Sequence, residues 1–441
     1  MQDVSTVTPG PPATEPIVLP AAEDPATGPA LVHAQHPGGS SNKRTLEALR
    51  GLAAMAVLVF HLGKPMAALG VHIPGYLAGE TGVQMFFVLS GYLIGSSVLA
   101  PTRFSGRDYS WKRVFRILPL YYFSILFGLL LVNAGPLMSR SGLKDIAVHL
   151  VLLQILSTHY RGSINGVLWT LSIEWLFYIF MLVIAGTFRR HTAGWVVAEA
   201  MVVLGLGWRV WIWLVYQGHP AALNDLYKQL PGLADVFGCG MILALIMHDP
   251  HLRAWCSRLS VAALGLIASV VAMVVLLVVF DANSPSATRE HYWSSPPMIV
   301  FWPFAFAVAC AGVVLFIQRF ELGLRPVLRW TGLGYLGLIS YSLYIMHTYV
   351  VTNMFRSYAQ AQPDVPAWLM IPAVIAMSIL LCSVTFYLVE QPFMRVRRRV
   401  QGRGPRSTAP DHTGDRGSDA SATADPIQGP PVPPVTTVWL R

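Results

Sequence analysis

Long apolar runs recur along the chain from about residue 46 to residue 389, and short polar segments separate them. Several runs approach the roughly 20 residues that an α-helix needs to cross the hydrocarbon core of a bilayer. Strands of a membrane barrel would instead alternate apolar and polar residues over segments of about ten residues. We therefore expect an all-α fold, a polytopic transmembrane helical bundle of about ten spans. The predicted spans are 46–63, 82–100, 114–133, 168–186, 194–216, 231–247, 259–280, 298–317, 335–353 and 367–389.

The apolar segment 143–160, "LKDIAVHLVLLQILSTHY", has two interpretations. If it spans the membrane, the basic segment 187–191 falls on the side opposite the other basic loops. If it dips into the membrane or lies at its surface, all the basic loops share one side. Because basic residues accumulate in cytoplasmic loops, we favour the second interpretation. It gives ten spans with both termini in the cytoplasm.

Composition supports an integral membrane protein. The chain has 441 residues, of which 54% are hydrophobic and 12% charged, and its mean hydropathy is +0.52. The net charge of +9 comes from short basic blocks between apolar runs, so we expect the lipid bilayer, and not nucleic acid, as the partner of these charges. The four cysteines are scattered without metal-ligand spacing, so we expect neither a metal site nor a disulfide framework.

The two ends of the chain differ in composition from the part between them. Residues 1–41 are rich in Pro, Ala, Gly and Thr, and residues 396–441 begin basic and become Pro-rich. Such segments bury too little apolar surface to fold, so we expect two disordered arms. The membrane domain is then predicted to span residues 42–395.

Two ionisable residues lie in the first predicted span. Arg50 and His61 are eleven residues apart, which is a rise of roughly 16 Å and about three helical turns, so they lie on nearly the same face. An ionisable group deep in a bilayer is costly and ordinarily faces a cavity or a partner, which favours a functional role. Alternatively, His61 bonds a neighbouring helix and Arg50 extends to the lipid headgroups.

Polar residues form a stripe in "LWTLSIEWLFY". Thr170, Glu174 and Tyr178 are spaced by four residues and share one helical face. A carboxylate in an apolar span needs a partner. We expect Glu174 to bind hydroxyl groups of a bound molecule or to orient an imidazole, whereas the structural alternative is a bond to Trp169 or to a neighbouring helix.

Two further segments carry polar residues in apolar surroundings. In "ISYSLYIMH", Ser340, Tyr344 and His347 follow one face, which is typical of either a cavity lining or a contact between helices. In "LSGYLIG", the glycines beside Ser90 form a small-residue face that favours close helix packing, so we expect only a supporting role for Ser90. We interpret Glu390 and Pro392 in the "EQPF" segment as the end of the last span, a helix stop beside a headgroup anchor.

Six motifs in one order carry a resemblance to a known family: "LRGLAAMAVLVFH", "GVQMFFVLSGYLI", "WKRVFRILPLYY", "LWTLSIEWLFY", "ISYSLYIMH" and "LVEQPF". The series resembles acyltransferase family 3, integral membrane O-acyltransferases that include glycan and macrolide O-acyltransferases. It runs from Arg50 to Pro392 and so covers the whole predicted membrane domain. In the serine–glycine–aromatic element, Tyr92 stands where the family more often has phenylalanine.

The resemblance implies a membrane O-acyltransferase of a bacterial-type inner or plasma membrane. Such an enzyme moves an acyl group, most often acetyl, from cytosolic acyl-coenzyme A to a hydroxyl of a carbohydrate or of a glycosylated or macrolide-type acceptor. It implies that His61 and Arg50, the two ends of the family's R-x10-H motif, are required for transfer. It also matches Arg113 and Arg116 to the family's R-x-x-R element.

Acyl transfer to an alcohol needs a base, donors for the oxyanion and a grip on the acyl carrier. A neutral imidazole suits the base, so we assign that role to His61. Arg50 is expected to contact the carrier or the developing negative charge, and Arg113 and Arg116 to bind the phosphates of coenzyme A. The candidates for binding the substrate are Glu174, Trp169, Tyr344, His347 and Ser90.

Three other classes of protein fit part of the pattern. The alternative function is a proton-coupled membrane transporter that uses the same buried Arg, His and Glu residues. A haem-bearing electron carrier is a second alternative, because His61, His149, His159 and His347 are candidate axial ligands. A scaffold without catalytic activity would leave the buried ionisable residues unexplained.

Overall fold

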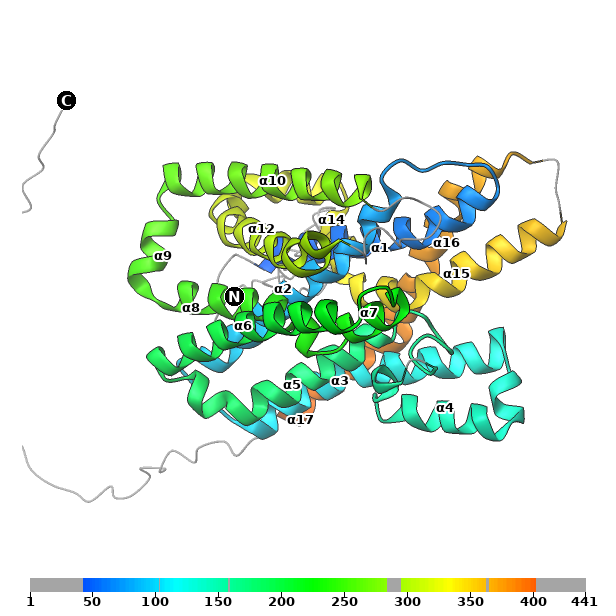
Figure 1. Cartoon of the computed structure of the whole chain (residues 1–441), viewed down its shortest axis with the longest axis horizontal. Helices are drawn as coiled ribbons and strands as arrows, with labels where there is room; N and C mark the ends of the chain where they lie inside the picture. Colours follow the sequence, from blue (N-terminus) through cyan, green and yellow to red (C-terminus); the bar gives the residue numbers. More distant parts are fainter. Residues whose placement is uncertain (1–42, 103, 158, 284–294, 362–364, 402–441) are drawn as a thin grey trace, which may run out of the picture.

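Long helices run side by side through the computed structural model, and no β-strand occurs among the residues that it describes (Figure 1). The structure describes residues 43–102, 104–157, 159–283, 295–361 and 365–401. The predicted arm 1–41 and the tail beyond residue 401 lie outside the described residues. The predicted tail boundary at 396 falls within α17 (Gln391–Gln401), so the basic start of that segment is helical. A polytopic helical bundle is confirmed.

Nine helical stretches in the described part of the chain are long and apolar enough to cross a membrane. Each of them coincides with one of the predicted spans. Their main helices are α1 (Lys43–Ala68), α2 (Gly82–Leu99), α3 (Gly106–Phe127), α5 (Trp169–Phe188), α6 (His191–Val215), α8 (Ala234–His248), α10 (Leu259–Ala282), α12 (Trp302–Ile317) and α16 (Met370–Thr385).

The remaining predicted span, 335–353, differs from the structure in its bounds and its polarity. Its first residues belong to the short helix α14 (Leu333–Leu338), and the long helix α15 (Ser340–Ala361) follows. At 22 residues, α15 is about 33 Å long, which is enough to cross the hydrocarbon core. It falls outside the nine apolar stretches because it carries polar residues, and several of these are buried inside the bundle.

The ambiguous segment 143–160 does not form a span. It contains most of α4 (Arg140–Leu150), an 11-residue helix about 16 Å long, which is too short to cross the hydrocarbon core. The hydroxyls of Tyr121 and Tyr122 on α3 donate hydrogen bonds to the carbonyls of His149 and Leu150, at 2.7 and 2.9 Å. These bonds fasten α4 near the C-terminal end of α3. In Figure 1, α4 and α9 (Pro250–Cys256) lie at opposite sides of the bundle.

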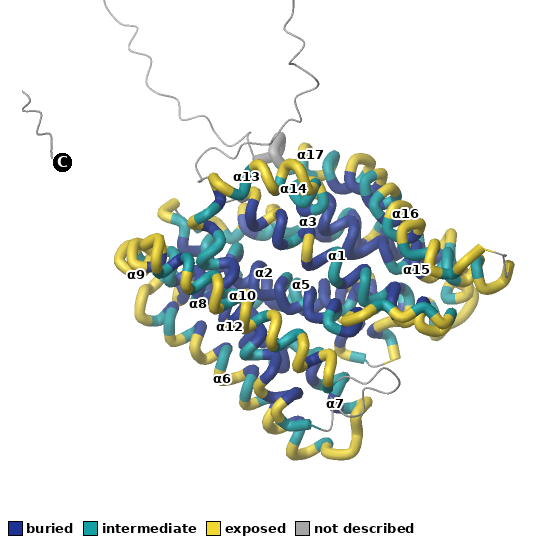
Figure 2. Tube along the Cα trace, turned by 90° about the horizontal axis from the view of Figure 1, so that it is seen from above, coloured by how far each residue is buried: buried dark blue, intermediate teal, exposed yellow. Residues whose placement is uncertain are grey.

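Helices α2 and α8 pack against each other and are largely buried, whereas α10 is largely exposed (Figure 2). In Figure 1, α10 runs along the upper edge of the bundle. A Cβ atom added to Gly91 would lie 2.3 Å from the carbonyl oxygen of Phe237, and one added to Gly240 would lie 2.2 Å from that of Val88. A Cβ atom added to Gly95 would lie 2.8 Å from the Cβ atom of Ala244. The small-residue face of α2 is therefore a packing surface, as the sequence predicts.

A buried ion pair joins α6 to α8. The guanidinium of Arg209 donates two hydrogen bonds of 2.6 Å to the two carboxylate oxygens of Asp235, and both residues are fully buried. Arg209 also donates to the carbonyls of Gly232 and Val300, at 2.8 and 3.0 Å. The carbonyl of Gly232 belongs to the 3-10 turn η5 (Pro231–Leu233) and that of Val300 to the π-helical turn η6 (Pro297–Phe301), so Arg209 joins α6 to three other elements. This pair lacks any sequence motif, and the sequence does not predict it.

Candidate active site

Two histidines from distant parts of the chain meet inside the bundle. The Nδ1 atom of His61 on α1 lies 3.2 Å from the Nε2 atom of His347 on α15, and the two ring centres are 4.9 Å apart. His347 is fully buried and His61 is half-buried. The other two histidines considered as haem ligands have different neighbours, because His149 contacts Asp145 and His159 contacts Tyr160.

The hydrogen bonds of His61 determine which of its nitrogens is basic. Its Nδ1 atom lies 2.9 Å from the carbonyl oxygen of Val57, one turn earlier on α1. A carbonyl oxygen only accepts hydrogen bonds, so Nδ1 carries the proton of the neutral ring. The proton is therefore absent from Nε2, which is the nitrogen that can act as a base or nucleophile.

Glu174 lies at the centre of a second polar group. The hydroxyl of Ser90 on α2 donates to Oε1 of Glu174 on α5 at 2.7 Å, and the hydroxyl of Tyr178, one turn later on α5, donates to the same oxygen. The predicted face of α5 thus points into the bundle. Glu174 therefore bonds a neighbouring helix, through Ser90 on α2.

Aromatic rings connect the two polar groups. The Phe86 ring on α2 lies 5.3 Å from the Tyr344 ring, and the Tyr344 ring lies 6.4 Å from that of His347. The Tyr344 hydroxyl lies 2.8 Å from Oγ1 of Thr170, whose own proton goes to the carbonyl of Val167. Tyr344 is therefore the donor in this bond, and its ring stands between the histidine pair and α5.

Arg50 joins the same interior from the other end of α1. Its guanidinium carbon lies 5.9 Å from the centre of the Phe86 ring, a cation–π contact. Arg50 also interacts electrostatically with Arg116 and Glu174. Its Nε atom is buried and makes no hydrogen bond to the described residues. A buried donor of this kind is costly to leave unbonded and marks a place where a ligand atom can bind.

The predicted carrier-binding pair on α3 borders this group. The Arg113 guanidinium donates to the Ser97 hydroxyl at 3.2 Å and lies 5.3 Å from the ring centres of both Tyr109 and Tyr178. Its Nε atom, like that of Arg50, is buried without a hydrogen bond to the described residues. Arg116, one turn later, acts electrostatically on Arg50. The structure thus places three arginines and Glu174 in one region.

Glu390 is a member of this region that sequence reasoning missed. We interpreted it as part of a helix stop beside a headgroup anchor, and that interpretation is wrong. The helical stretch continues into α17, and the side chain of Glu390 is buried and accepts a hydrogen bond from Ser342 on α15 at 3.0 Å. Arg116 and Arg50 both act on it electrostatically. The π-helical turn η9 (Phe386–Glu390) precedes α17 and carries this residue into the bundle. The available signal was the "LVEQPF" motif itself, in which a carboxylate follows an apolar run.

Trp169 lies at the first turn of α5, next to Thr170. Its ring is 6.5 Å from that of Phe87, and the ammonium group of Lys228 lies 5.2 Å from its centre. Trp169 therefore contacts Phe87 and Lys228, while Thr170 reaches the Tyr344 side of the site.

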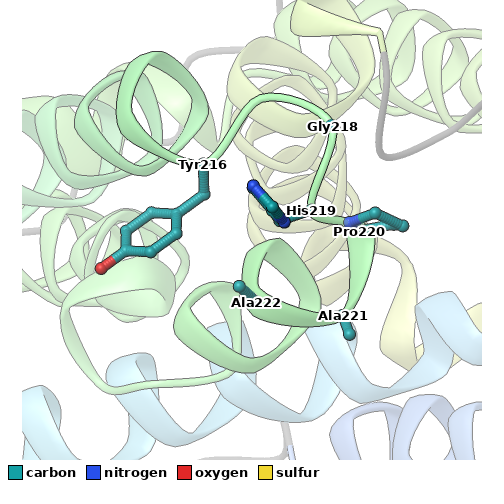
Figure 3. Close-up of a pocket in the computed structure, with 6 residues that line it drawn as sticks. All are labelled: Tyr216, Gly218, His219, Pro220, Ala221 and Ala222. Carbon is teal, nitrogen blue, oxygen red and sulfur yellow. The ribbon is translucent and has the colours of Figure 1, made fainter.

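The surface also has an open hollow of about 490 Å³ where α6 meets α7 (Pro220–Tyr227), shown in Figure 3. It is lined by Tyr216, Gly218, His219, Pro220, Ala221 and Ala222. None of the residues discussed above lines it. Within the described ranges, no group of three or more His, Cys, Asp or Glu side chains is placed to hold a metal ion. The four cysteines are buried free thiols.

The fold and these contacts define an integral membrane helical bundle with ionisable side chains gathered in its interior. The acyltransferase domain model matches residues 44–387, and the chain belongs to this acyltransferase family, which is acyltransferase family 3. The resemblance carried by the six motifs is thereby confirmed.

Three relatives illustrate the range of the family. The chain is 26% identical over 380 residues to "Putative membrane-bound transacylase BcsY" of Komagataeibacter xylinus, covering 82% of this chain and 85% of that protein. It is 23% identical over 388 residues to "Nodulation protein 10" of Rhizobium leguminosarum bv. viciae, covering 82% and 96%. It is 22% identical over 373 residues to a "Putative O-acetyltransferase" of Staphylococcus aureus, covering 79% of this chain and 57% of that longer protein. No solved structure matches the chain.

Proposed function

We propose that this membrane acyltransferase moves an acyl group, in the first instance acetyl, from cytosolic acyl-coenzyme A to a hydroxyl of a carbohydrate or of a glycosylated or macrolide-type acceptor. The observation that carries the proposal is the 2.9 Å contact between Nδ1 of the half-buried His61 and the carbonyl oxygen of Val57, from which it follows that Nε2 is the basic nitrogen. The names of the relatives, a transacylase and an O-acetyltransferase, support the reaction type.

In direct transfer, Nε2 of His61 takes the proton of the acceptor hydroxyl as the hydroxyl oxygen attacks the thioester carbon. The carbon–sulfur bond breaks, and the thiolate of coenzyme A leaves with that proton returned to it. An arginine with a donor unbonded in the protein can stabilise the oxyanion or hold the carrier. Arg50 has such a donor in Nε and lies in the same interior.

We assign the binding of the acyl carrier, coenzyme A, to Arg113 and Arg116. Coenzyme A carries several phosphate charges, and a guanidinium pairs with phosphate through a planar fork of donors. Of the two, Arg113 has a buried Nε without a hydrogen bond to the described residues. In the proposed orientation both termini are cytoplasmic, so α3 begins at the cytoplasmic side and offers these arginines to a cytosolic carrier. Glu174, Trp169, Tyr344 and Ser90 then border the acceptor.

Replacing Arg113 and Arg116 together by alanine should raise the KM for acyl-coenzyme A more than the KM for the acceptor. Each lost phosphate contact removes a charge-assisted hydrogen bond, so we expect an increase of about tenfold or more in the first constant. The matched control is the double change Arg107→Ala and Lys112→Ala, which removes two exposed charges from the same helix. Equal effects of the two double variants would show that only the general positive charge matters.

The proposed reaction is tested with the purified protein, isotope-labelled acetyl-coenzyme A and an extract of envelope glycans and small metabolites. We expect release of coenzyme A and the appearance of labelled ester on a hydroxyl-bearing product, read by mass spectrometry with and without the protein. Movement of a solute across proteoliposomes without consumption of acyl-coenzyme A would contradict the proposal and favour the transporter.

A further inference from the structure

The hydrogen bonds of His347 leave one of its nitrogens facing His61. Its Nδ1 atom lies 2.8 Å from the carbonyl oxygen of Leu343, one turn earlier on α15. Because that oxygen only accepts, Nδ1 of His347 carries the proton of the neutral ring. Its Nε2 atom is then an acceptor, and it lies 3.2 Å from Nδ1 of His61.

The facing atom of His61 is a donor. The carbonyl of Val57 already requires a proton on Nδ1 of His61, so the contact between the two rings is an N–H group facing a nitrogen lone pair. The ring planes cross at 67°, an edge-on arrangement in which the N–H of one ring can point at the edge of the other. The one proton on Nδ1 of His61 therefore faces two acceptors, the carbonyl of Val57 and Nε2 of His347, and the two acceptors share it while both rings are neutral.

We infer that His347 is a positioning residue that acts through His61, and that it occupies the place of the carboxylate in a Ser-His-Asp triad. The inference rests on the proposed function, and it replaces the role in substrate binding that the sequence suggested. As His61 takes a proton from the acceptor, its Nδ1–H becomes a stronger donor. The imidazole nitrogen of His347 is a more basic acceptor for that donor than the carbonyl of Val57.

Each proton in this scheme is accounted for. The O–H bond of the acceptor breaks and an N–H bond forms at Nε2 of His61, which makes this ring an imidazolium. Its Nδ1–H is shared with Nε2 of His347, while His347 keeps its own proton toward Leu343. The proton on Nε2 then goes to the thiolate of coenzyme A, and both rings return to the neutral state with no other reactant.

The surroundings favour a neutral acceptor over a carboxylate at this place. His347 is fully buried, and the rings of Tyr344 and His61 lie against it. An ionised carboxylate without several hydrogen bonds would be costly there, whereas a neutral imidazole with both nitrogens bonded is not. The contact also holds the His61 ring in one orientation.

Substitution of His347 by each of two amides, asparagine and glutamine, distinguishes the positioning role from simple packing. In His347→Asn the amide nitrogen falls near the position of Nδ1, so it can still donate to Leu343, but the acceptor facing His61 is lost. In His347→Gln the amide extends to about the position of Nε2, where its oxygen can accept from His61. We expect His347→Asn to lower kcat by about 10²-fold with less than about threefold change in either KM, and His347→Gln to stay within about tenfold of the wild type.

The control for folding is the melting temperature of both variants in the detergent used for kinetics. A folded His347→Asn variant with near-normal kcat would overturn the inference, and so would equal losses in the Asn and Gln variants, since these would show that the imidazole only fills space.

A second readout does not depend on turnover. In ¹⁵N-histidine-labelled wild-type protein, the signals lost in His61→Ala identify His61, and we expect them to show the proton on Nδ1 bonded to a ring nitrogen. If the wild-type protein transfers the acyl group but carries the proton of His61 on Nε2, the inference is wrong and the proposed function is unaffected. Absence of transfer in the wild type would overturn the proposed function, and the catalytic role of His347 with it, even where the ring pairing is observed.

Discussion

Arg209→Met is expected to destabilise the protein by about 3–5 kcal/mol, the range for breaking a buried ion pair by removing one partner. The change leaves the carboxylate of Asp235 fully buried without its two 2.6 Å bonds. It also leaves the carbonyls of Gly232 and Val300 without the donor that connects α6, α8 and η6. The measurement is thermal unfolding in detergent, followed for wild-type and variant proteins under identical conditions.

The matched control is the double variant Arg209→Met with Asp235→Asn, which removes the charge left behind. Asparagine keeps the size of the side chain, which matters because the backbone of Gly205 lies directly against Asp235. We expect the double variant to unfold at a higher temperature than Arg209→Met alone. Equal melting temperatures for Arg209→Met and the wild type would mean that the pair does not stabilise the bundle.

His61→Ala is expected to lower kcat by about 10²–10⁴-fold, the usual contribution of a positioned general base. The KM for acyl-coenzyme A should change much less, because the arginines of α3 and not His61 are assigned to the carrier. Steady-state kinetics with each substrate varied in turn measure both constants. His251→Ala is the control, since it removes an exposed imidazole from α9.

The helices could be predicted from the sequence where a run is apolar on all sides. The predicted span 259–280 corresponds to α10 (Leu259–Ala282), which lies at the edge of the bundle and exposes apolar residues along its length. The bounds of α15 could not be found in this way. Its buried His347 and serines lower the hydropathy, because this helix faces polar partners inside the protein and not lipid.

The sequence predicted those relations within the site that join residues of one helix, and it did not predict contacts between residues far apart in the chain. The stripe of Thr170, Glu174 and Tyr178 lies within two turns of one helix, so periodicity alone placed it on one face. The bond from Ser90 to Glu174 joins residues 84 positions apart, and the contact between the histidines joins residues 286 positions apart.

Local patterns cannot reveal such contacts, because they depend on how the helices pack. Glu390 was missed for a related reason. A carboxylate at the end of an apolar run is typical of a helix terminus, and only the turn η9 carries this one inward to Ser342.

The most direct test of the central claim, that acyl transfer depends on the basic nitrogen of His61, is the transfer rate per folded molecule of the wild-type and His61→Ala proteins. Melting temperature is followed in the same detergent samples, so that loss of folded protein is separated from loss of chemistry. The account predicts closely similar melting temperatures and a transfer rate that is lower in His61→Ala by about 10²-fold or more. A stable His61→Ala variant with near-normal turnover would contradict it and remove this histidine from the mechanism.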